Sequence, residues 1–189
     1  MASGDVLKVS VDAGSNWATV TNDVTGDPDT ALSTDITLSG TSAIHLRITD
    51  DAGNVGDADT TSYILDTTAP TITYATVDIS ADTGSSATDF ITKTAAQTLT
   101  GTLSAAMASD DILKVSVDAG SSWDDVTADV TGTPDTALST VIALSGTSAI
   151  HLQITDDAGN AGTADTTSYI LDTTAPTISF SSVDISADT

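Results

Sequence analysis

The sequence predicts an all-β protein that consists of tandem β-sandwich domains. Three observations support this prediction: apolar and polar residues alternate in several short segments, turn-forming residues separate those segments, and most of the chain repeats itself once. All 27 acidic residues are aspartate, which favours turns, and glutamate, which favours helices, is absent. No segment shows convincing helical periodicity.

The internal repeat has a period of about 106 residues. Segments 1–83 and 107–189 align without gaps and are about four-fifths identical. In particular, ITDDAGNVGDADTTSYILDTTAP at 48–70 returns at 154–176 with two substitutions. We therefore expect a partial repeat at 1–66 that lacks its first strands, a complete repeat at 67–172, and the opening strand of a third repeat at 173–189. These partial ends indicate a window from a longer array, and the alternative is that a C-terminal strand completes the first domain of another chain.

One complete period is expected to hold about seven short strands, at 71–79, 94–103, 111–118, 126–130, 140–144, 149–154 and 166–171. Alternation directs Leu113, Val115 and Val117 inward, and Lys114 and Ser116 outward. The same pattern directs Leu99 and Leu103 to one side. It directs three further apolar residues inward and their neighbours outward: Ile150, Leu152 and Ile154, against His151 and Gln153.

This number of strands, separated by turns, predicts an immunoglobulin-like β-sandwich. Trp123, and Trp17 in the first copy, are expected to fill the core. A single helical turn could form at Asp135. The chain has no cysteine, so no disulfide supports the sandwich and its core must hold by packing.

The charge of the chain excludes several partners. The formal net charge is −23, and the four basic residues could not neutralise the phosphates of a nucleic acid or of an anionic membrane surface. No apolar run is long enough to span a membrane, so direct membrane insertion is not expected. Met1 is followed by ASGDVLK, which has no apolar signal-peptide region.

Two sets of acidic residues are candidate calcium sites, because Ca²⁺ prefers six to eight oxygen ligands from carboxylates, amides and carbonyls. The first set surrounds the joint between consecutive repeats and occurs twice: Asp50, Asp51, Asn54, Asp59 and Asp66, then Asp156, Asp157, Asn160, Asp165 and Asp172. The second set lies in one loop and comprises Asp78, Asp82 and Asp89. Alternatively, these aspartates only form turns by accepting backbone hydrogen bonds. Their spacing matches neither an EF-hand nor a glycine-rich nonapeptide repeat.

Catalytic motifs are not found. His45 and His151 occupy equivalent outward positions on a strand, and the sequence has no GxSxG, HExxH, dinucleotide or P-loop pattern. We therefore expect a protein that is not an enzyme.

The combination of DDAGN, TTSYILDTTAPTI, DTGSSATDFIT and LTGTL resembles the immunoglobulin-like tandem repeats of giant bacterial surface adhesins, both biofilm-associated proteins and the extender regions of repeats-in-toxin (RTX) adhesins. The resemblance implies a secreted, calcium-stiffened spacer that carries a binding tip away from the cell. By the same resemblance, Asp66 and Asp172 are linker ligands, and four neighbouring turn residues contribute further ligands: Asp50, Asp51, Asp156 and Asp157. Asp57 becomes Thr163 in the second copy, so a ligand at that position is not general.

The expected function is a calcium-stiffened structural spacer in cell adhesion and biofilm formation, located outside the cell or at the bacterial surface. Its expected partners are the adjacent repeats of the same chain and, in a self-assembling filament, neighbouring copies. The other alternative is an adhesin module that binds ice or a glycan. Scattered threonines argue against ice, and few aromatic residues argue against glycans.

Overall fold

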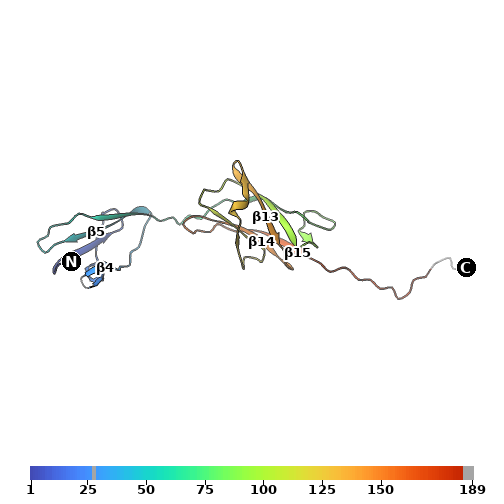
Figure 1. The fold of residues 1–189 in the computed structure, drawn as a ribbon, viewed down its shortest axis with the longest axis horizontal. Helices are drawn as coiled ribbons and strands as arrows, with labels where there is room; N and C mark the ends of the chain where they lie inside the picture. Colours follow the sequence, from blue (N-terminus) through green and yellow to red (C-terminus); the bar gives the residue numbers. More distant parts are fainter. Residues whose placement is uncertain (27–28, 185–189) are drawn as a thin grey trace. The chain divides into compact units, whose positions relative to one another are not determined.

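The computed structural model describes residues 1–26 and 29–184 and is all-β, as the sequence predicts. The chain divides into two compact units, Met1–Thr68 (unit 1) and Ala69–Thr189 (unit 2) (Figure 1). Within the described residues, the only helices are two three-residue 3₁₀ turns, η1 at Thr21–Asp23 and η2 at Thr127–Asp129. No helix among these residues is long and apolar enough to cross a membrane.

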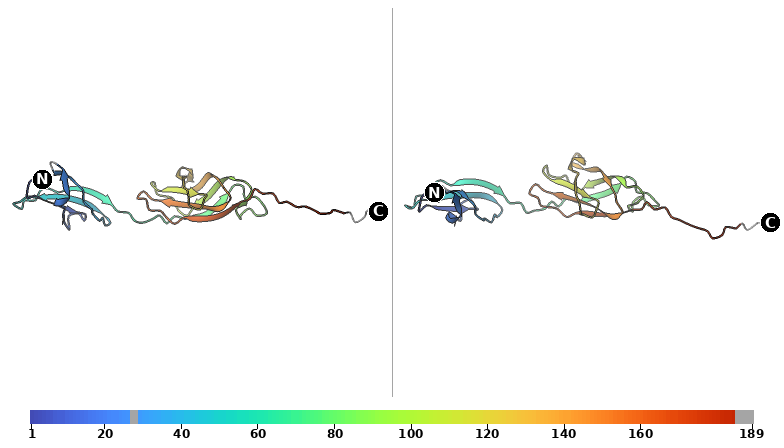
Figure 2. Two further views of the ribbon diagram at one scale, coloured as in Figure 1. Left: turned by 90° about the horizontal axis from the view of Figure 1, so that it is seen from below. Right: turned by 60° about the horizontal axis from the view of Figure 1, so that its bottom comes forward.

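Unit 2 is a sandwich of two sheets (Figures 1 and 2). The five-stranded sheet has the order β11-β10-β14-β15-β8, and the four-stranded sheet has the order β12-β13-β9-β7. All pairs are antiparallel except β15 with β8. The strands are β7 Tyr74–Ile79, β8 Ile91–Thr92, β9 Ala96–Leu103, β10 Ile112–Ser116, β11 Asp124–Asp125, β12 Val130–Gly132, β13 Asp135–Ala143, β14 Thr147–Thr155 and β15 Asp165–Leu171.

This order of strands is the immunoglobulin-like one. In that fold the first, second, fifth and fourth strands form one sheet, and the third, sixth and seventh form the other. In unit 2 the corresponding strands are β7, β9, β13 and β12 in one sheet, and β10, β14 and β15 in the other. The prediction of an immunoglobulin-like sandwich without a disulfide is therefore confirmed.

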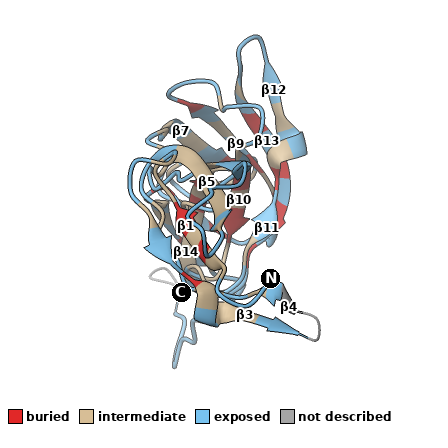
Figure 3. Cartoon of the chain, turned by 90° about the vertical axis from the view of Figure 1, so that its left-hand side faces the viewer, coloured by how far each residue is buried: buried red, intermediate tan, exposed pale blue. Residues whose placement is uncertain are grey.

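The core of unit 2 lies between its two sheets. Leu113 and Val115 of β10 and Leu99 and Leu103 of β9 are all less than 4% exposed, and they belong to one apolar cluster. Figure 3 shows buried residues on β9, β10, β13 and β14. Ile150, Leu152 and Ile154 are also buried, as their alternation predicts. This burial stabilises unit 2 chiefly by removing apolar surface from water.

Unit 1 repeats only part of this sandwich. One sheet has the order β2-β1-β5-β6, and β3 pairs with β4 in a separate two-stranded sheet. The strands are β1 Val6–Ser10, β2 Ala18–Thr19, β3 Val24–Gly26, β4 Asp29–Leu32, β5 Thr41–Thr49 and β6 Asp59–Ile64. Among the described residues of unit 1, nothing corresponds to β7, β8 or β9. In the described part of this unit, the buried apolar core comprises Leu7, Val9 and Val20.

Ser116 was expected to face outward, and this expectation is wrong. Its side chain is 2% exposed because it closes the turn that follows β10. The Ser116 hydroxyl donates to the Asp118 carboxylate at 2.7 Å and accepts from the Gly120 amide at 2.8 Å. A turn that folds back over the end of the strand therefore overrides simple alternation.

The two tryptophans were expected to fill the core, and this is also wrong. Neither belongs to an apolar core cluster, and both are half-buried. The Trp123 indole N–H donates to the Gly120 carbonyl, and its ring meets His151 edge to face, with ring centroids 6.2 Å apart. In unit 1 the Trp17 ring meets His45 in the same way and also lies under the guanidinium of Arg47.

Several elements differ from the expected ones. Residues 126–130 were expected to form a strand, but they contain η2 and only the beginning of β12. The helical turn that the sequence allows at Asp135 does not form, and Asp135 is instead the start of the nine-residue strand β13, which pairs with β9 over most of its length. The two-residue strand β8 was not foreseen, because so short a segment carries no periodic signal.

Residues 173–184 form no strand. The predicted opening strand of a third repeat spans 173–189, and residues 185–189 lie outside the described part of the chain. The prediction about this segment therefore stays a prediction.

Candidate functional site

The DDAGN turn is built in the same way in both copies. In unit 2, the Asp156 carboxylate accepts the backbone N–H of Asn160 at 2.7 Å and its side-chain N–H at 2.9 Å. The Asp156 amide donates back to the Asn160 carbonyl at 3.1 Å. Asp50 and Asn54 repeat these contacts in unit 1. The turn between two strands is thus closed by its own first and last residues.

These hydrogen bonds favour the ionised carboxylate. The side-chain N–H of Asn160 is the main cause that lowers the pKa of Asp156, and the side-chain N–H of Asn54 does the same for Asp50. Both carboxylates already serve as acceptors, which is the turn-forming role that the sequence left open. Each carboxylate oxygen still has a second lone pair, so the turn does not prevent a cation from binding.

Asp51 and Asp157 are exposed at the same turns. In unit 1 the Asp51 carboxylate lies directly against Gly4, so closely that a Cβ on Gly4 would be 2.7 Å from the carboxylate carbon. The counterpart of Gly4 in unit 2 is Asp110. Unit 2 therefore carries an additional negative charge, that of Asp110, in the loop that neighbours this turn. Sequence reasoning missed this residue. The Gly4-to-Asp110 difference between the repeats was its only signal.

Asp165 lies at the start of β15 and binds the backbone of another strand. Its carboxylate accepts the Tyr74 amide at 2.7 Å, just where the chain passes into β7. The same end of unit 2 holds the Pro70 carbonyl against Gly162, where an added Cβ would be only 2.6 Å from that oxygen. The DDAGN turn and Asp165 therefore belong to the end at which the chain enters unit 2.

Asp172 lies at the other end of β15, seven residues further along the strand. Its amide donates to the Thr92 carbonyl at 2.8 Å, and its carboxylate accepts the Thr174 amide at 2.9 Å. Asp66 makes the corresponding contact with Thr68. A strand of this length spans about 20 Å. The structure therefore does not bring Asp172 together with Asp156, Asp157, Asn160 and Asp165 within one unit.

The Asp78, Asp82 and Asp89 set is only partly brought together. Asp82 accepts the Phe90 amide through Oδ2 at 3.0 Å, and Asp89 accepts the Ile91 amide at 3.1 Å, so both flank the start of β8. Asp78 is exposed on β7 and accepts only its neighbour, the Ile79 amide. Asp78 thus lies on the strand that precedes the loop, whereas the other two residues lie in it.

A cavity of about 270 Å³ joins this loop to Asp172. It is lined by Thr83, Gly84, Ile91, Thr92, Lys93 and Asp172. Asp172 and Asp82 are 90 positions apart in the sequence, and β8 is the element that brings both to this end of unit 2. Lys93 in the same lining supplies a positive charge that a bound cation would have to approach.

Asp82 provides the observation that best fits a cation. Its Oδ1 is buried and has no hydrogen-bond partner among the described residues. A buried carboxylate oxygen without a partner is costly, and a hard cation with oxygen ligands would satisfy it. In the described part of the chain, however, no three acidic or histidine side chains are grouped as a metal site. The neighbouring ligand oxygens would therefore include carbonyls and hydroxyls, which Ca²⁺ accepts.

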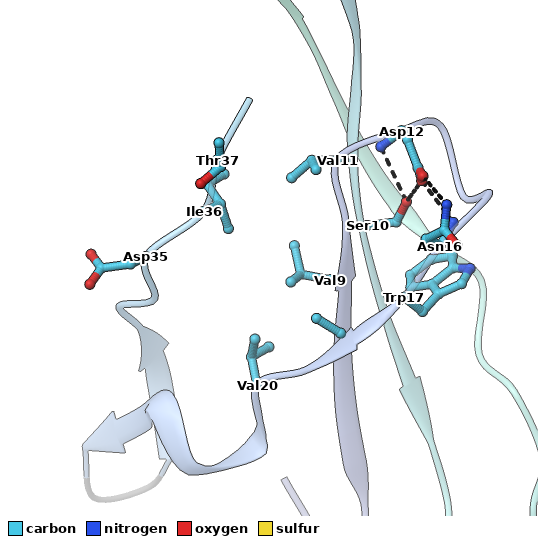
Figure 4. Close-up of a pocket in the computed structure, with 11 residues that line it drawn as sticks. Val9, Ser10, Val11, Asp12, Asn16, Trp17, Val20, Asp35, Ile36 and Thr37 are labelled. Carbon is cyan, nitrogen blue, oxygen red and sulfur yellow. Dashed lines mark hydrogen bonds between the residues drawn. The ribbon is translucent and has the colours of Figure 1, made fainter. Parts of the chain in front are cut away.

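A further carboxylate turn was missed by the sequence reasoning. Asp12 accepts the backbone and side-chain N–H groups of Asn16 at 2.8 and 2.6 Å, and the Ser10 hydroxyl at 2.7 Å (Figure 4). These hydrogen bonds, the Asn16 backbone N–H first, lower the pKa of Asp12 to about 2. Asp118 and Ser122 form the same turn in unit 2. The aspartate followed four residues later by Asn or Ser, in DAGSN and DAGSS, was the available signal.

Comparisons with known proteins found similarity to solved structures. No protein-family model matches the chain, and no curated protein matches it. A solved structure described as "Crystal structure of tetra-tandem repeat in extending region of large adhesion protein" is similar to it, with 20% sequence identity and a TM-score of 0.29. The match covers 89% of this chain and 42% of that chain, so this chain spans less than half the length of that protein.

Proposed function

We propose that this chain is a structural spacer, a tandem repeat of a large extracellular adhesion protein at the bacterial surface, and that it is not an enzyme. The observation that carries the proposal lies within unit 2. The chain enters beside the DDAGN turn, where Pro70 contacts Gly162, and leaves after Asp172 at the opposite end of β15. A domain with its termini at opposite ends adds length with every repeat, which is what a spacer requires.

Near identity of the two copies supports the same function. About four-fifths of the aligned positions are unchanged, including the whole TTSYILDTTAP connector. A ligand-binding tip needs one specialised surface, whereas a spacer needs many equivalent domains. The similar structure described as the extending region of a large adhesion protein is consistent with this proposal, and the proposal does not depend on it.

Calcium is the proposed cofactor. Unit 2 carries carboxylates at both ends, and all its candidate ligands are oxygen atoms, as Ca²⁺ prefers. Asp82, with its buried unpartnered Oδ1, and Asp172 would hold a cation beside β8. Asp156, Asp157, Asn160 and Asp165 would supply oxygens at the other end. A bound cation would offset the repulsion between carboxylates and restrict the loops that flank each connector.

The test combines small-angle X-ray scattering and thermal unfolding of the 189-residue chain, first in excess EDTA and then with calcium. Extracellular calcium modules bind with Kd of about 10⁻⁴ to 10⁻³ M, so about 10 mM Ca²⁺ should stabilise the folded state by about 1.4 to 2.7 kcal/mol. We expect the melting temperature to rise and the maximum particle dimension to increase. An equal concentration of magnesium is the control, because Mg²⁺ requires a stricter octahedral site.

Two results would contradict parts of this proposal. If neither melting temperature nor particle dimension responds to calcium, the aspartates serve only as turn-forming residues and the calcium role fails. If calcium instead produces assemblies whose mass grows with protein concentration, the alternative of a self-assembling filament replaces the spacer.

A further inference from the structure

Unit 1 exposes apolar side chains that unit 2 buries. We define the open face of unit 1 by six apolar residues whose counterparts in unit 2 are all buried: Leu7, Val9, Val20, Ile36, Leu46 and Ile48. Leu7, Val9 and Val20 are buried in unit 1 as well, so the difference between the units lies in Ile36, Leu46 and Ile48. Ile36 is 39% exposed whereas Ile142 is 7% exposed, and Ile48 is 40% exposed whereas Ile154 is 3% exposed. The residue types are identical in each pair. The difference in exposure therefore comes from the surroundings of these side chains in each unit.

Two cavities open on this face. The first, of about 350 Å³, is lined by Val9, Val11, Val20 and Ile36 among others, and Figure 4 shows Ile36 facing the valines across it. The second, of about 270 Å³, is lined by Leu7, Leu46, Ile48 and the turn around Asp59. The counterparts of these apolar residues belong to the closed core of unit 2.

Backbone pairing on unit 1 is also incomplete. In unit 2, β13 continues from Asp135 to Ala143, and residues from Ala137 onward pair antiparallel with β9. In unit 1 the corresponding strand β4 ends at Leu32, and residues 33–37 form no strand. The inward-facing Thr34 and Ile36 of this segment are unchanged in unit 2 as Thr140 and Ile142. The segment thus has the side chains of a strand and lacks a strand to pair with.

Unit 2 shows which residues complete the sandwich. Leu99 and Leu103 of β9 and Ile79 of β7 are buried in its core beside the counterparts of the open face. The end of β15 pairs with β8, and Asp165 binds the Tyr74 amide. All of these covering groups lie within residues 69–106. The residues of unit 2 that these groups contact have counterparts in the sequence of unit 1, and Asp59 is the counterpart of Asp165.

We propose that the open face of unit 1 is a docking surface for an extended polypeptide segment with the chemistry of residues 69–106. A β9-like strand of that segment adds antiparallel to residues 33–37, its leucines enter the two cavities, and Asp59 accepts an amide as Asp165 does. Adding a strand in this way satisfies backbone groups and buries alternate side chains at the same time.

The C-terminal segment of a second copy fits this face less well. Residues 173–184 repeat 67–78 and so correspond to the connector and β7. In unit 2, β7 pairs with β9, and it is β9 that pairs with β13. The segment 173–184 contains no counterpart of Leu99 or Leu103. Its apolar residues Ile178, Phe180 and Val183 are 70–83% exposed.

The first experiment adds a synthetic peptide of residues 69–106 to the full chain and follows amide hydrogen exchange. We expect one peptide to bind per chain and exchange at residues 33–37 to slow by at least about tenfold, since a newly paired strand opens less often. A peptide carrying Leu99→Asp and Leu103→Asp is the control and should not bind. In the chain, Ile36→Asp should abolish binding and Asp59→Ala should weaken it, while Ile178→Asp should leave it unchanged.

A fusion keeps the test valid if the peptide aggregates. Joining the sequence of residues 69–106 directly before Met1 reproduces the natural junction between 106 and 107, because Met1 is the counterpart of Met107. We expect the same protection of residues 33–37 in the fusion, and its loss with Ile36→Asp. Unchanged exchange at these amides in the fusion would overturn the proposal. Concentration-dependent dimers of the original chain that Ile178→Asp abolishes would overturn it in favour of the C-terminal segment.

Discussion

The Asp165 carboxylate accepts the backbone N–H of Tyr74 at 2.7 Å and so joins the start of β15 to the start of β7 across 91 positions. The Tyr74 hydroxyl is buried without a hydrogen-bond partner among the described residues. Burial, followed by the nearby negative charge of Asp165, raises the pKa of the Tyr74 phenol far above its usual range. Asp165 is thus a structural residue at the end where the chain enters unit 2.

Replacing Asp165 should therefore destabilise unit 2 even without calcium. We expect Asp165→Ala to cost about 1.5 to 3 kcal/mol, the usual contribution of a hydrogen bond to a charged group. The measurement is calorimetric unfolding in EDTA. Asp59→Ala is the matched control: Asp59 accepts the adjacent Thr60 amide, and its loss should cost less than about 0.5 kcal/mol. Equal losses for both variants would show that the Tyr74 bond contributes nothing.

Equivalent isoleucines should differ in their effect on stability. Ile154→Ala removes a side chain that is 3% exposed and should cost about 2 to 5 kcal/mol by leaving a cavity in the core of unit 2. Ile48→Ala removes one that is 40% exposed and should cost roughly half as much or less. Urea unfolding of each variant checks the difference. This difference between the two variants should disappear in the fusion that places the sequence of residues 69–106 before Met1, because Ile48 would then be covered.

The Asp118 turn predicts an acid-sensitive contribution to stability. The Ser122 side chain, then the Ser122 backbone and the Ser116 hydroxyl, donate to this carboxylate and hold its pKa well below the ordinary value of 3.8. Because the folded-state pKa is depressed, the stabilisation is complete above about pH 4 and is lost as pH falls toward the folded-state pKa. The loss of melting temperature caused by Asp118→Asn should therefore be largest at neutral pH and shrink below pH of about 3.5. A constant difference down to pH of about 2 would contradict this origin.

The Arg47 guanidinium lies 3.8 Å from the centre of the Trp17 ring. Its counterpart in unit 2 is Gln153, which instead donates to the Gly162 carbonyl. We expect Arg47→Gln to destabilise unit 1 by about 0.5 to 1 kcal/mol and to change Trp17 fluorescence. The reciprocal variant, Gln153→Arg, tests whether the contact can be transferred to Trp123. If Arg47→Gln changes neither stability nor fluorescence, the ring contact is energetically neutral.

Asp82 should contribute to the rise in melting temperature that calcium causes by binding at the end of unit 2 beside β8. Asp82→Asn keeps the shape of the side chain but weakens a cation ligand, so it should reduce the rise in melting temperature caused by calcium. Asp78→Asn is the matched control, because Asp78 is exposed on β7 and its replacement by Asn removes the same charge as Asp82→Asn. Equal reductions in both variants would indicate general charge screening rather than a site.

Local patterns were enough to predict most strands and the fold class. Ile150, Leu152 and Ile154 alternate with polar residues and all face the core. Position in the repeat also indicated which segments are equivalent. The candidate ligands were grouped less well, because Asp165 and Asp172 are close in sequence and yet lie at opposite ends of a strand. Conversely, Asp82 and Asp172 are distant in sequence and are brought to one end by β8.

Composition, alternation and the repeat thus determined an all-β, disulfide-free tandem sandwich rich in aspartate turns. Tertiary structure decided which of these segments complete their pairing. Residues 33–37 and 139–143 share their inward side chains, but only the second segment forms a strand, because β9 supplies its backbone partners. A strand is stabilised by its neighbour and by the surface it buries, and neither is encoded within the strand itself.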